Sequence, residues 1–101
     1  MNQFITVAQL TDLNPERALS VKVGDRDVAL FILAGEVFAL DARCPHRGGP
    51  LGEAMLENGK AYCPMHGWEF DVRTGACHDN HERPARCYAV QVVDGQVQVK
   101  I

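Results

Sequence analysis

Hydrophobic and polar residues alternate along much of this chain, and a period of two predicts β-strands rather than helices. Residues 18–42 predict three strands, with breaks at Gly24-Asp25 and Ala34-Gly35, where residues typical of hairpin turns stand. Hydrophobic side chains recur at every second position within these strands, as expected for a strand with one buried face; they are Val21 and Val23, then Val28, Leu30 and Ile32.

Both ends of the chain extend this β pattern. A short β-branched run at 4–7 predicts a first strand, and residues 11–17 carry turn and helix-start residues. Residues 87–101 predict a closing hairpin that turns at Asp94-Gly95, with alternating valines on both sides of the turn. The chain is therefore predicted to be an all-β protein in a single domain, residues 1–101.

The middle of the chain, residues 43–87, has a different character. It holds all 4 cysteines, all 4 histidines, four of the 5 prolines and six of the 9 glycines. Residues 60–63 and 68–72 predict short strands there, whereas the acidic stretch 52–59 is interpreted as a turn-rich connector on the surface. We expect an insertion rich in potential metal ligands between the strands of the β domain.

Composition narrows the functional classes. The net charge of −3 gives no electrostatic reason to expect binding to nucleic acid or anionic lipid. No stretch approaches the roughly 20 apolar residues that cross a bilayer, and the first ten residues do not resemble a signal peptide. We therefore expect a cytoplasmic protein, in which cysteines are thiols or metal ligands rather than disulfides.

Two Cys–His motifs carry the candidate chemistry. Cys44 and His46 stand two positions apart, and after sixteen residues Cys63 and His66 stand three positions apart. Two thiolates and two imidazoles could form a closed zinc site. Zinc fingers usually place a cysteine pair first and a histidine pair later, whereas here each motif supplies one of each. That order also suits a binuclear centre in which the cysteines bind one iron and the histidines bind the other.

The sequences CPHRGGPL and CPMHGWEFDVRTG, which contain these motifs, resemble the two binding loops of Rieske proteins. In that family two histidines replace two cysteines on one iron of a [2Fe–2S] cluster. The resemblance implies that Cys44 and Cys63 bind the inner iron, and that His46 and His66 bind the outer iron near solvent. It also implies the Rieske fold, an antiparallel β-sandwich or barrel base with a two-loop cluster-binding subdomain at about 43–86.

The sequence departs from the respiratory and photosynthetic members that it resembles. Those proteins carry an extra disulfide-forming cysteine in each loop, at positions occupied here by Gly49 and Met65. They also carry hydroxyl residues at the positions of Trp68 and Phe70, which have no hydroxyl to donate to sulfur. Fewer donors stabilise the reduced cluster less, so we expect a reduction potential near the low end of the Rieske range of roughly −150 to +300 mV.

Other residues of the insertion receive ordinary structural interpretations. Cys77 and Cys87 are expected to be buried or half-buried thiols, and His78 and His81 to lie in a solvated loop. Trp68 and Phe70 are expected to pack beneath the second loop. Three glycines are expected to adopt positive φ and bring backbone N–H groups near the cluster; they are Gly48, Gly49 and Gly52. Pro84 resembles a proline of a third loop that covers the cluster in this family.

The resemblance implies an electron carrier rather than an enzyme. A length of 101 residues leaves no room for the mononuclear iron domain of Rieske oxygenases, and no G-x-G-x-x-G nucleotide fingerprint is present. One interpretation is a ferredoxin that carries electrons from a flavoprotein reductase to the terminal oxygenase of a dioxygenase system. Another is the small subunit of an assimilatory NAD(P)H nitrite reductase, bound to its sirohaem large subunit. A zinc-bound structural module is the third.

Overall fold

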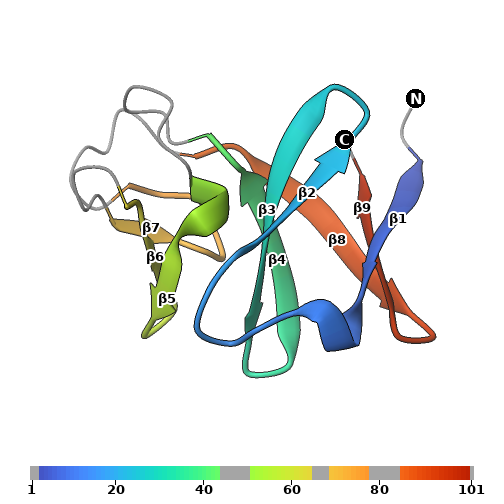
Figure 1. Ribbon diagram of the computed structural model, residues 1–101, viewed down its shortest axis with the longest axis horizontal. Helices are drawn as coiled ribbons and strands as arrows, with labels where there is room; N and C mark the ends of the chain where they lie inside the picture. The colour runs from blue at the N-terminus through green and yellow to red at the C-terminus, as the bar shows by residue number, and fades with distance from the viewer. Residues whose placement is uncertain (1–2, 44–50, 65–68, 78–84, 101) are drawn as a thin grey trace.

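The larger part of the protein is a curved sheet of six antiparallel strands. The structure is a computed structural model, and it describes residues 3–43, 51–64, 69–77 and 85–100. The strands follow the order β1-β9-β8-β4-β3-β2, and contact between the outer strands β1 and β2 nearly closes the sheet into a barrel (Figure 1). The six strands are β1 (Phe4–Gln9), β2 (Leu19–Val23), β3 (Arg26–Leu33), β4 (Glu36–Asp41), β8 (Cys87–Val93) and β9 (Gln96–Lys100).

A second sheet lies beside the barrel, at the left in Figure 1. Its three short strands are antiparallel, in the order β5-β6-β7, and are β5 (Met55–Glu57), β6 (Lys60–Tyr62) and β7 (Glu69–Asp71). Two single-turn 3-10 helices, Leu10–Asp12 and Leu51–Glu53, complete the regular structure of the described residues. The predicted all-β class is confirmed, and the small sheet contains both strands that were expected between 60 and 72.

The hairpin turns are those that the sequence predicts. Gly24, Ala34, Gly35, Asp94 and Gly95 all have positive φ, and each turn joins strands that pair directly across it. Positive φ at both central residues, as at Ala34-Gly35 and Asp94-Gly95, is the backbone of a type I′ turn, whose twist matches that of the strands it joins. Local turn chemistry thus sets the register of the barrel hairpins.

Strand β3 is buried on both faces, which corrects the expectation of one buried face. Val28 and Leu30 point into the barrel, whereas Ala29 and Phe31 belong to a second cluster beneath the small sheet. All four are 0% exposed. We call the first group the barrel cluster and the second the inter-sheet cluster. The second sheet therefore covers what would otherwise be the solvent face of β3.

The stretch 52–59 is not a surface connector, and that prediction was wrong. It forms a 3-10 turn and then β5, with Gly52, Ala54 and Leu56 buried and the residues between them exposed. The acidic side chains Glu53 and Glu57 thus occupy the outer face of a half-buried segment. The inner face consists mainly of small residues, which give a weak hydrophobic signal in the sequence.

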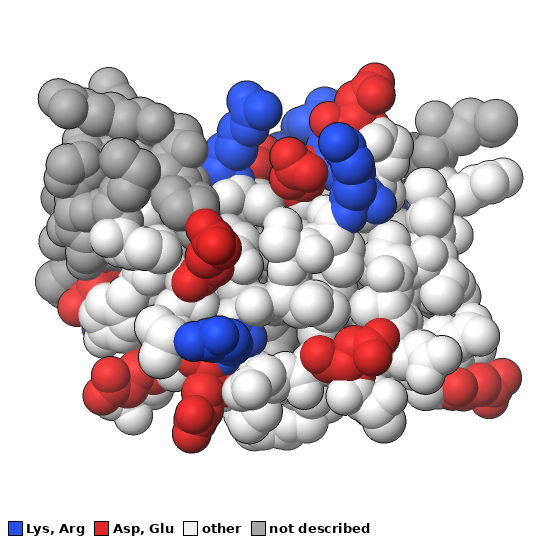
Figure 2. Space-filling model, in the orientation of Figure 1, with Lys and Arg blue, Asp and Glu red and all other residues white. Residues whose placement is uncertain are grey.

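Charged side chains of both signs mix on the face seen in Figure 2, so that neither sign forms a continuous band over its described residues. Among the described residues, no helix is long and apolar enough to span a membrane.

Candidate metal centre

Backbone hydrogen bonds join the two ends of the first motif segment. The Gly52 N–H donates to the Ala42 carbonyl at 3.1 Å, and the Ala42 N–H donates to the Asp27 carbonyl at 2.9 Å. Cys44 and His46, the predicted ligands of this segment, lie outside the described residues. Because Ala42 is hydrogen-bonded to the barrel and Gly52 to Ala42, the described residues at the two ends of this segment lie together on the barrel.

Gly52 has a role different from the predicted one. Its φ is not positive, unlike that of Gly24, Gly35, Gly59, Gly75 and Gly95. A Cβ on Gly52 would instead lie 2.9 Å from the Ser20 Cβ on β2 and 3.3 Å from the Ala42 Cβ. Glycine is thus required here for close approach of two segments rather than for an unusual backbone angle. Gly48 and Gly49 lie outside the described residues.

The second motif begins at the end of β6. Tyr62 pairs with Glu69 of β7, so the pairing of these two strands closes the segment that carries Cys63 and His66. A salt bridge of 3.5 Å between Lys60 Nζ and Glu69 Oε2 links the same two strands on the surface. Cys63 is described, whereas His66 lies outside the described residues. The β6–β7 ladder therefore fixes the position of the Cys63 backbone.

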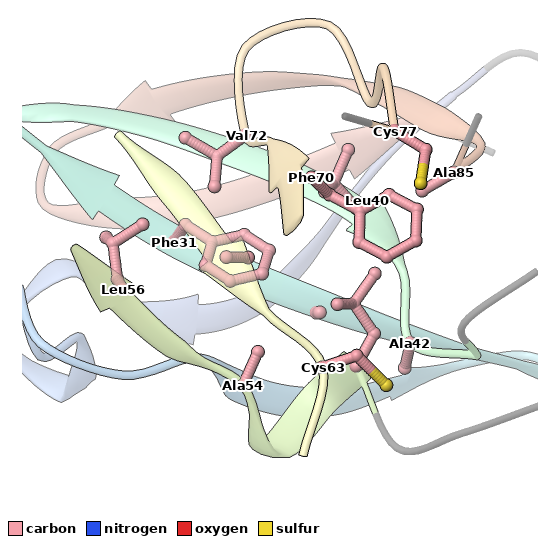
Figure 3. Close-up of a cluster of buried hydrophobic side chains, with 13 residues drawn as sticks. Phe31, Leu40, Ala42, Ala54, Leu56, Cys63, Phe70, Val72, Cys77 and Ala85 are labelled. Carbon is pink, nitrogen blue, oxygen red and sulfur yellow. The ribbon is translucent and has the colours of Figure 1, made fainter. Parts of the chain in front are cut away.

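Cys63 is a buried free thiol in the inter-sheet cluster. Its exposed fraction is 1%, and it forms no disulfide. Figure 3 shows its sulfur at the end of the cluster where Ala42 lies, on the far side from Leu56. A thiol at the margin of an apolar cluster, next to the base of the first motif segment, is suitably placed to bind a metal together with ligands from that segment.

A third segment returns to the same cluster. Phe70 and Cys77 form an isolated antiparallel bridge, and the Ala85 N–H donates to the Gly75 carbonyl at 2.7 Å. Phe70, Cys77 and Ala85 are all buried in the inter-sheet cluster, at 0%, 0% and 4% exposure (Figure 3). The expectations of core packing for Phe70 and of a buried thiol for Cys77 are confirmed. Trp68, His78, His81 and Pro84 lie outside the described residues.

Cys87 is exposed, so the expectation of a buried or half-buried thiol was wrong for this residue. It begins β8 on the outer face, whereas the next residue, Tyr88, points inward and is buried. Its Sγ lies 3.8 Å from the Arg73 carbonyl, to which the thiol donates. Partial desolvation raises the pKa of the Cys87 thiol, and a hydrogen bond from the Tyr88 backbone opposes this shift.

The described residues fit an iron–sulfur cluster. No group of three or more His, Cys, Asp or Glu side chains that could hold a metal occurs within the described ranges, where Cys63 is the described member of the predicted set. Its buried sulfur and the apolar surroundings suit a thiolate-ligated cluster shielded from water.

A match to a model of a known protein family covers nearly the whole chain. The model of the Rieske [2Fe-2S] domain matches residues 3–96. This chain belongs to the Rieske [2Fe-2S] domain family. The Rieske resemblance inferred from the two motifs is thereby confirmed, and with it the [2Fe–2S] cofactor.

Two curated relatives of this Rieske protein illustrate its similarity. The anthranilate 1,2-dioxygenase ferredoxin subunit of Burkholderia cepacia is 39% identical over 80 residues, covering 77% of this chain and 73% of the relative. The ferredoxin component of the naphthalene 1,2-dioxygenase/salicylate 5-hydroxylase systems of a Ralstonia species is 30% identical over 99 residues, covering 97% and 95%. These relatives are carriers of oxygenase systems, so this Rieske protein is an electron carrier rather than an enzyme.

Solved structures share the fold over nearly the whole chain. The ferredoxin of carbazole 1,9a-dioxygenase from Nocardioides aromaticivorans IC177 superposes with a TM-score of 0.88 at 28% identity, covering 96% of both chains. The ferredoxin of a carbazole 1,9a-dioxygenase complex, with its oxygenase, gives 0.87 at 26% identity, covering 99% and 94%. A proposed NADH-dependent nitrite reductase small subunit from Mycobacterium tuberculosis gives 0.89 at 25% identity, covering 100% and 96%.

Sequence reasoning found the ligand motifs, but it gave Gly52 a different role and gave no role to Gly75. Gly52 joins the first segment to the barrel, and Gly75 contacts Ala85 at the base of the third. Gly75 ends the sequence DVRTG, in which Asp and Thr precede Gly in a manner typical of turns. That turn signal could have identified Gly75 from sequence.

Proposed function

We propose that Cys44 and Cys63 bind one iron of the [2Fe–2S] cluster and that His46 and His66 bind the other. The observation that carries this proposal is the position of Cys63, whose buried thiol lies in the same cluster as Ala42, at the base of the first motif segment. The pairing of β6 with β7 and the Gly52–Ala42 hydrogen bond hold the two segments at this place. Residues 43–86 would then act as the cluster-binding part of a single domain.

The cluster supplies one-electron chemistry, and the surrounding residues of this chain supply a rigid and water-poor environment. Leu51, Phe70 and Cys77 are each 0% exposed and pack in the same cluster as Cys63. Such apolar packing limits the access of water to the thiolate and restricts its movement when the charge changes. Both effects favour fast electron exchange over reaction with solvent.

We further propose that the protein accepts electrons from a flavoprotein reductase and delivers them to a terminal oxygenase, in the cytoplasm. Support comes from relatives that match most of this chain and are named as ferredoxin components of dioxygenase systems. The neighbour named as a nitrite reductase small subunit supports an alternative partner, a sirohaem nitrite reductase large subunit.

The deciding experiment is an affinity purification from native extract, with the tagged protein loaded with its cluster. Iron, zinc and labile sulfide are assayed first, because zinc without sulfide would contradict the iron–sulfur assignment. Mass spectrometry then identifies the proteins that copurify in stoichiometric amount. Recovery of a flavoprotein reductase or an oxygenase supports the proposed role, whereas equal amounts of a large sirohaem reductase would overturn it in favour of the nitrite reductase subunit.

A further inference from the structure

Gly75 occupies an unusually crowded position at the base of the third segment. A Cβ built on this residue would lie 2.2 Å from the Ala85 carbonyl oxygen and 3.2 Å from its carbon. The obstacle is backbone rather than the flexible end of a side chain, so it cannot move without shifting the chain at Ala85. Gly75 also has φ +79, a backbone conformation that side-chain-bearing residues rarely adopt.

Three backbone hydrogen bonds converge at this turn. The Gly75 N–H donates to the Asp71 carbonyl at 2.7 Å, and the Asp71 N–H donates to the Ala76 carbonyl at 2.9 Å. The Ala85 N–H then donates to the Gly75 carbonyl at 2.7 Å. Gly75 is therefore the point at which the end of β7 is joined to the chain entering β8.

The same turn is connected to the environment of Cys63. Phe70, Cys77 and Ala85 flank the turn in sequence or in contact, and all three belong to the inter-sheet cluster with Cys63 (Figure 3). In Figure 3 the Phe70 ring lies between Ala85 and Cys63, so displacement of Ala85 from Gly75 would loosen the packing of Phe70 against the part of the cluster that holds Cys63.

We propose that Gly75 is a positioning residue for electron transfer: its close contact with Ala85 keeps water away from the Cys63 thiolate and so holds the reduction potential low. This inference rests on the proposed ligand set. With two thiolates and two neutral imidazoles, the reduced cluster carries one more negative charge than the oxidised cluster. Water next to the thiolate favours the more charged form, so loosening this contact should raise the potential.

Gly95 provides a matched control. Its φ is +78, nearly that of Gly75, but a Cβ on Gly95 would meet nothing within 4 Å. Gly75→Ala and Gly95→Ala therefore introduce the same backbone strain, and only the first introduces the clash with Ala85. We expect Gly75→Ala to raise the midpoint potential, change the electron paramagnetic resonance spectrum of the reduced protein and bleach several-fold faster in air. Gly95→Ala should leave the potential and the spectrum unchanged.

If Gly75→Ala does not fold, two substitutions of Thr74 test the proposal with a smaller disturbance of the same turn. The exposed Thr74 holds the same turn, because its Oγ1 accepts a hydrogen bond from the Ala76 N–H at 3.2 Å. Thr74→Val removes this bond and should raise the potential by a smaller amount, whereas Thr74→Ser retains it and should restore the wild-type value.

The proposal is overturned if Gly75→Ala gives the potential, spectrum and bleaching rate of Gly95→Ala, or if Thr74→Val and Thr74→Ser behave alike. Failure of the ligand assignment would show differently, because Cys63→Ala would then retain its full content of iron and sulfide whatever Gly75→Ala does.

Discussion

A Cβ placed on Gly52 would lie 2.9 Å from both the Cβ and the Oγ of Ser20 on β2. The end of the first motif segment at Gly52 thus lies directly against β2. Gly52→Ala should force the two apart and lower the free energy of unfolding by about 1–3 kcal/mol, the usual cost of overpacking a close contact. Thermal or urea unfolding of the variant measures this loss.

A second substitution tests whether Ser20 is the cause. Ser20→Gly removes the side chain that Gly52→Ala would strike, so the double variant should lose less stability than the sum of the two single variants. Strict additivity would contradict the contact.

The barrel hairpins could be predicted from sequence because their signals are local. Ala34-Gly35 and Asp94-Gly95 adopt the positive φ values that their turns require, and the strands on both sides follow from them. The extent of burial could not be predicted in the same way. Ala29 and Phe31 are buried because β5, β6 and β7 form a second sheet over them, which depends on residues 24 to 42 positions further along the chain.

The candidate site likewise has features that local sequence predicts and features that depend on contacts between distant residues. The spacing of the Cys and His residues indicated the chemistry, and the buried position of Cys63 agrees with it. The contacts of Gly52 with Ser20 and of Gly75 with Ala85 join segments distant in sequence, and a glycine alone does not reveal whether it serves a turn or a close approach. The exposure of Cys87 was missed because a one-residue change of phase exchanges the two faces of a strand.

Cys63 and Cys77 allow a direct test of ligand against core thiol. Both are buried in the inter-sheet cluster, at 1% and 0% exposure, so replacement by alanine removes a similar volume from similar surroundings. Cys63→Ala should lose the cluster, whereas Cys77→Ala should retain iron and labile sulfide and lose about 1 kcal/mol of stability. Absorption spectra with iron and sulfide assays distinguish the two. If Cys77→Ala lost the cluster and Cys63→Ala kept it, the assignment of Cys63 as the ligand would be wrong.

The Cys87 thiol should react slowly for an exposed cysteine. Burial raises the pKa of this thiol above its ordinary value, and the thiolate is the reactive form. At pH 8 its alkylation by iodoacetamide, mapped by mass spectrometry, should be slower than that of a free thiol. The midpoint of the dependence of the alkylation rate on pH should lie at higher pH. A midpoint below the ordinary thiol pKa would contradict the structure.

The same shift has a consequence for stability. Because the folded state holds the Cys87 proton more tightly than the unfolded state, this contribution is fully present below the unfolded pKa and is lost as the pH rises through the folded pKa. As the pH rises into the alkaline range, the free energy of unfolding of Cys87→Ser should therefore fall less than that of the wild type.

The Tyr88 hydroxyl is buried in the barrel and has no hydrogen-bond partner among the described residues. Tyr88→Phe keeps the ring in place, together with the Arg86 guanidinium 5.2 Å from its centroid. Since the hydroxyl is hydrated only in the unfolded chain, its removal should raise the free energy of unfolding by about 1 kcal/mol. Tyr88→Ala should instead lose about 3 kcal/mol by leaving a cavity. A fall of more than about 1 kcal/mol in Tyr88→Phe would reveal a lost hydrogen bond.

Phe70 offers a test of the low reduction potential expected for this protein. It is 0% exposed, lies in the same cluster as Cys63, and occupies a position at which the respiratory proteins that the chain resembles carry a hydroxyl residue. We expect a wild-type potential near the low end of roughly −150 to +300 mV. A hydroxyl donating to a ligand sulfur should stabilise the reduced form by about 1 kcal/mol more than the oxidised form. For a one-electron couple, Phe70→Tyr should then raise the potential by about 40 mV.

Phe31 supplies the control for this substitution, because it is equally buried in the inter-sheet cluster but lies on β3. Phe31→Tyr should lower stability by burying a hydroxyl while leaving the potential unchanged. Protein-film voltammetry measures both variants against the wild type. A wild-type potential above about +100 mV, well into the upper part of the family range, would show that donors other than these side chains stabilise the reduced cluster. An equal shift in both variants would show that Phe70 has no special relation to the ligand sulfur.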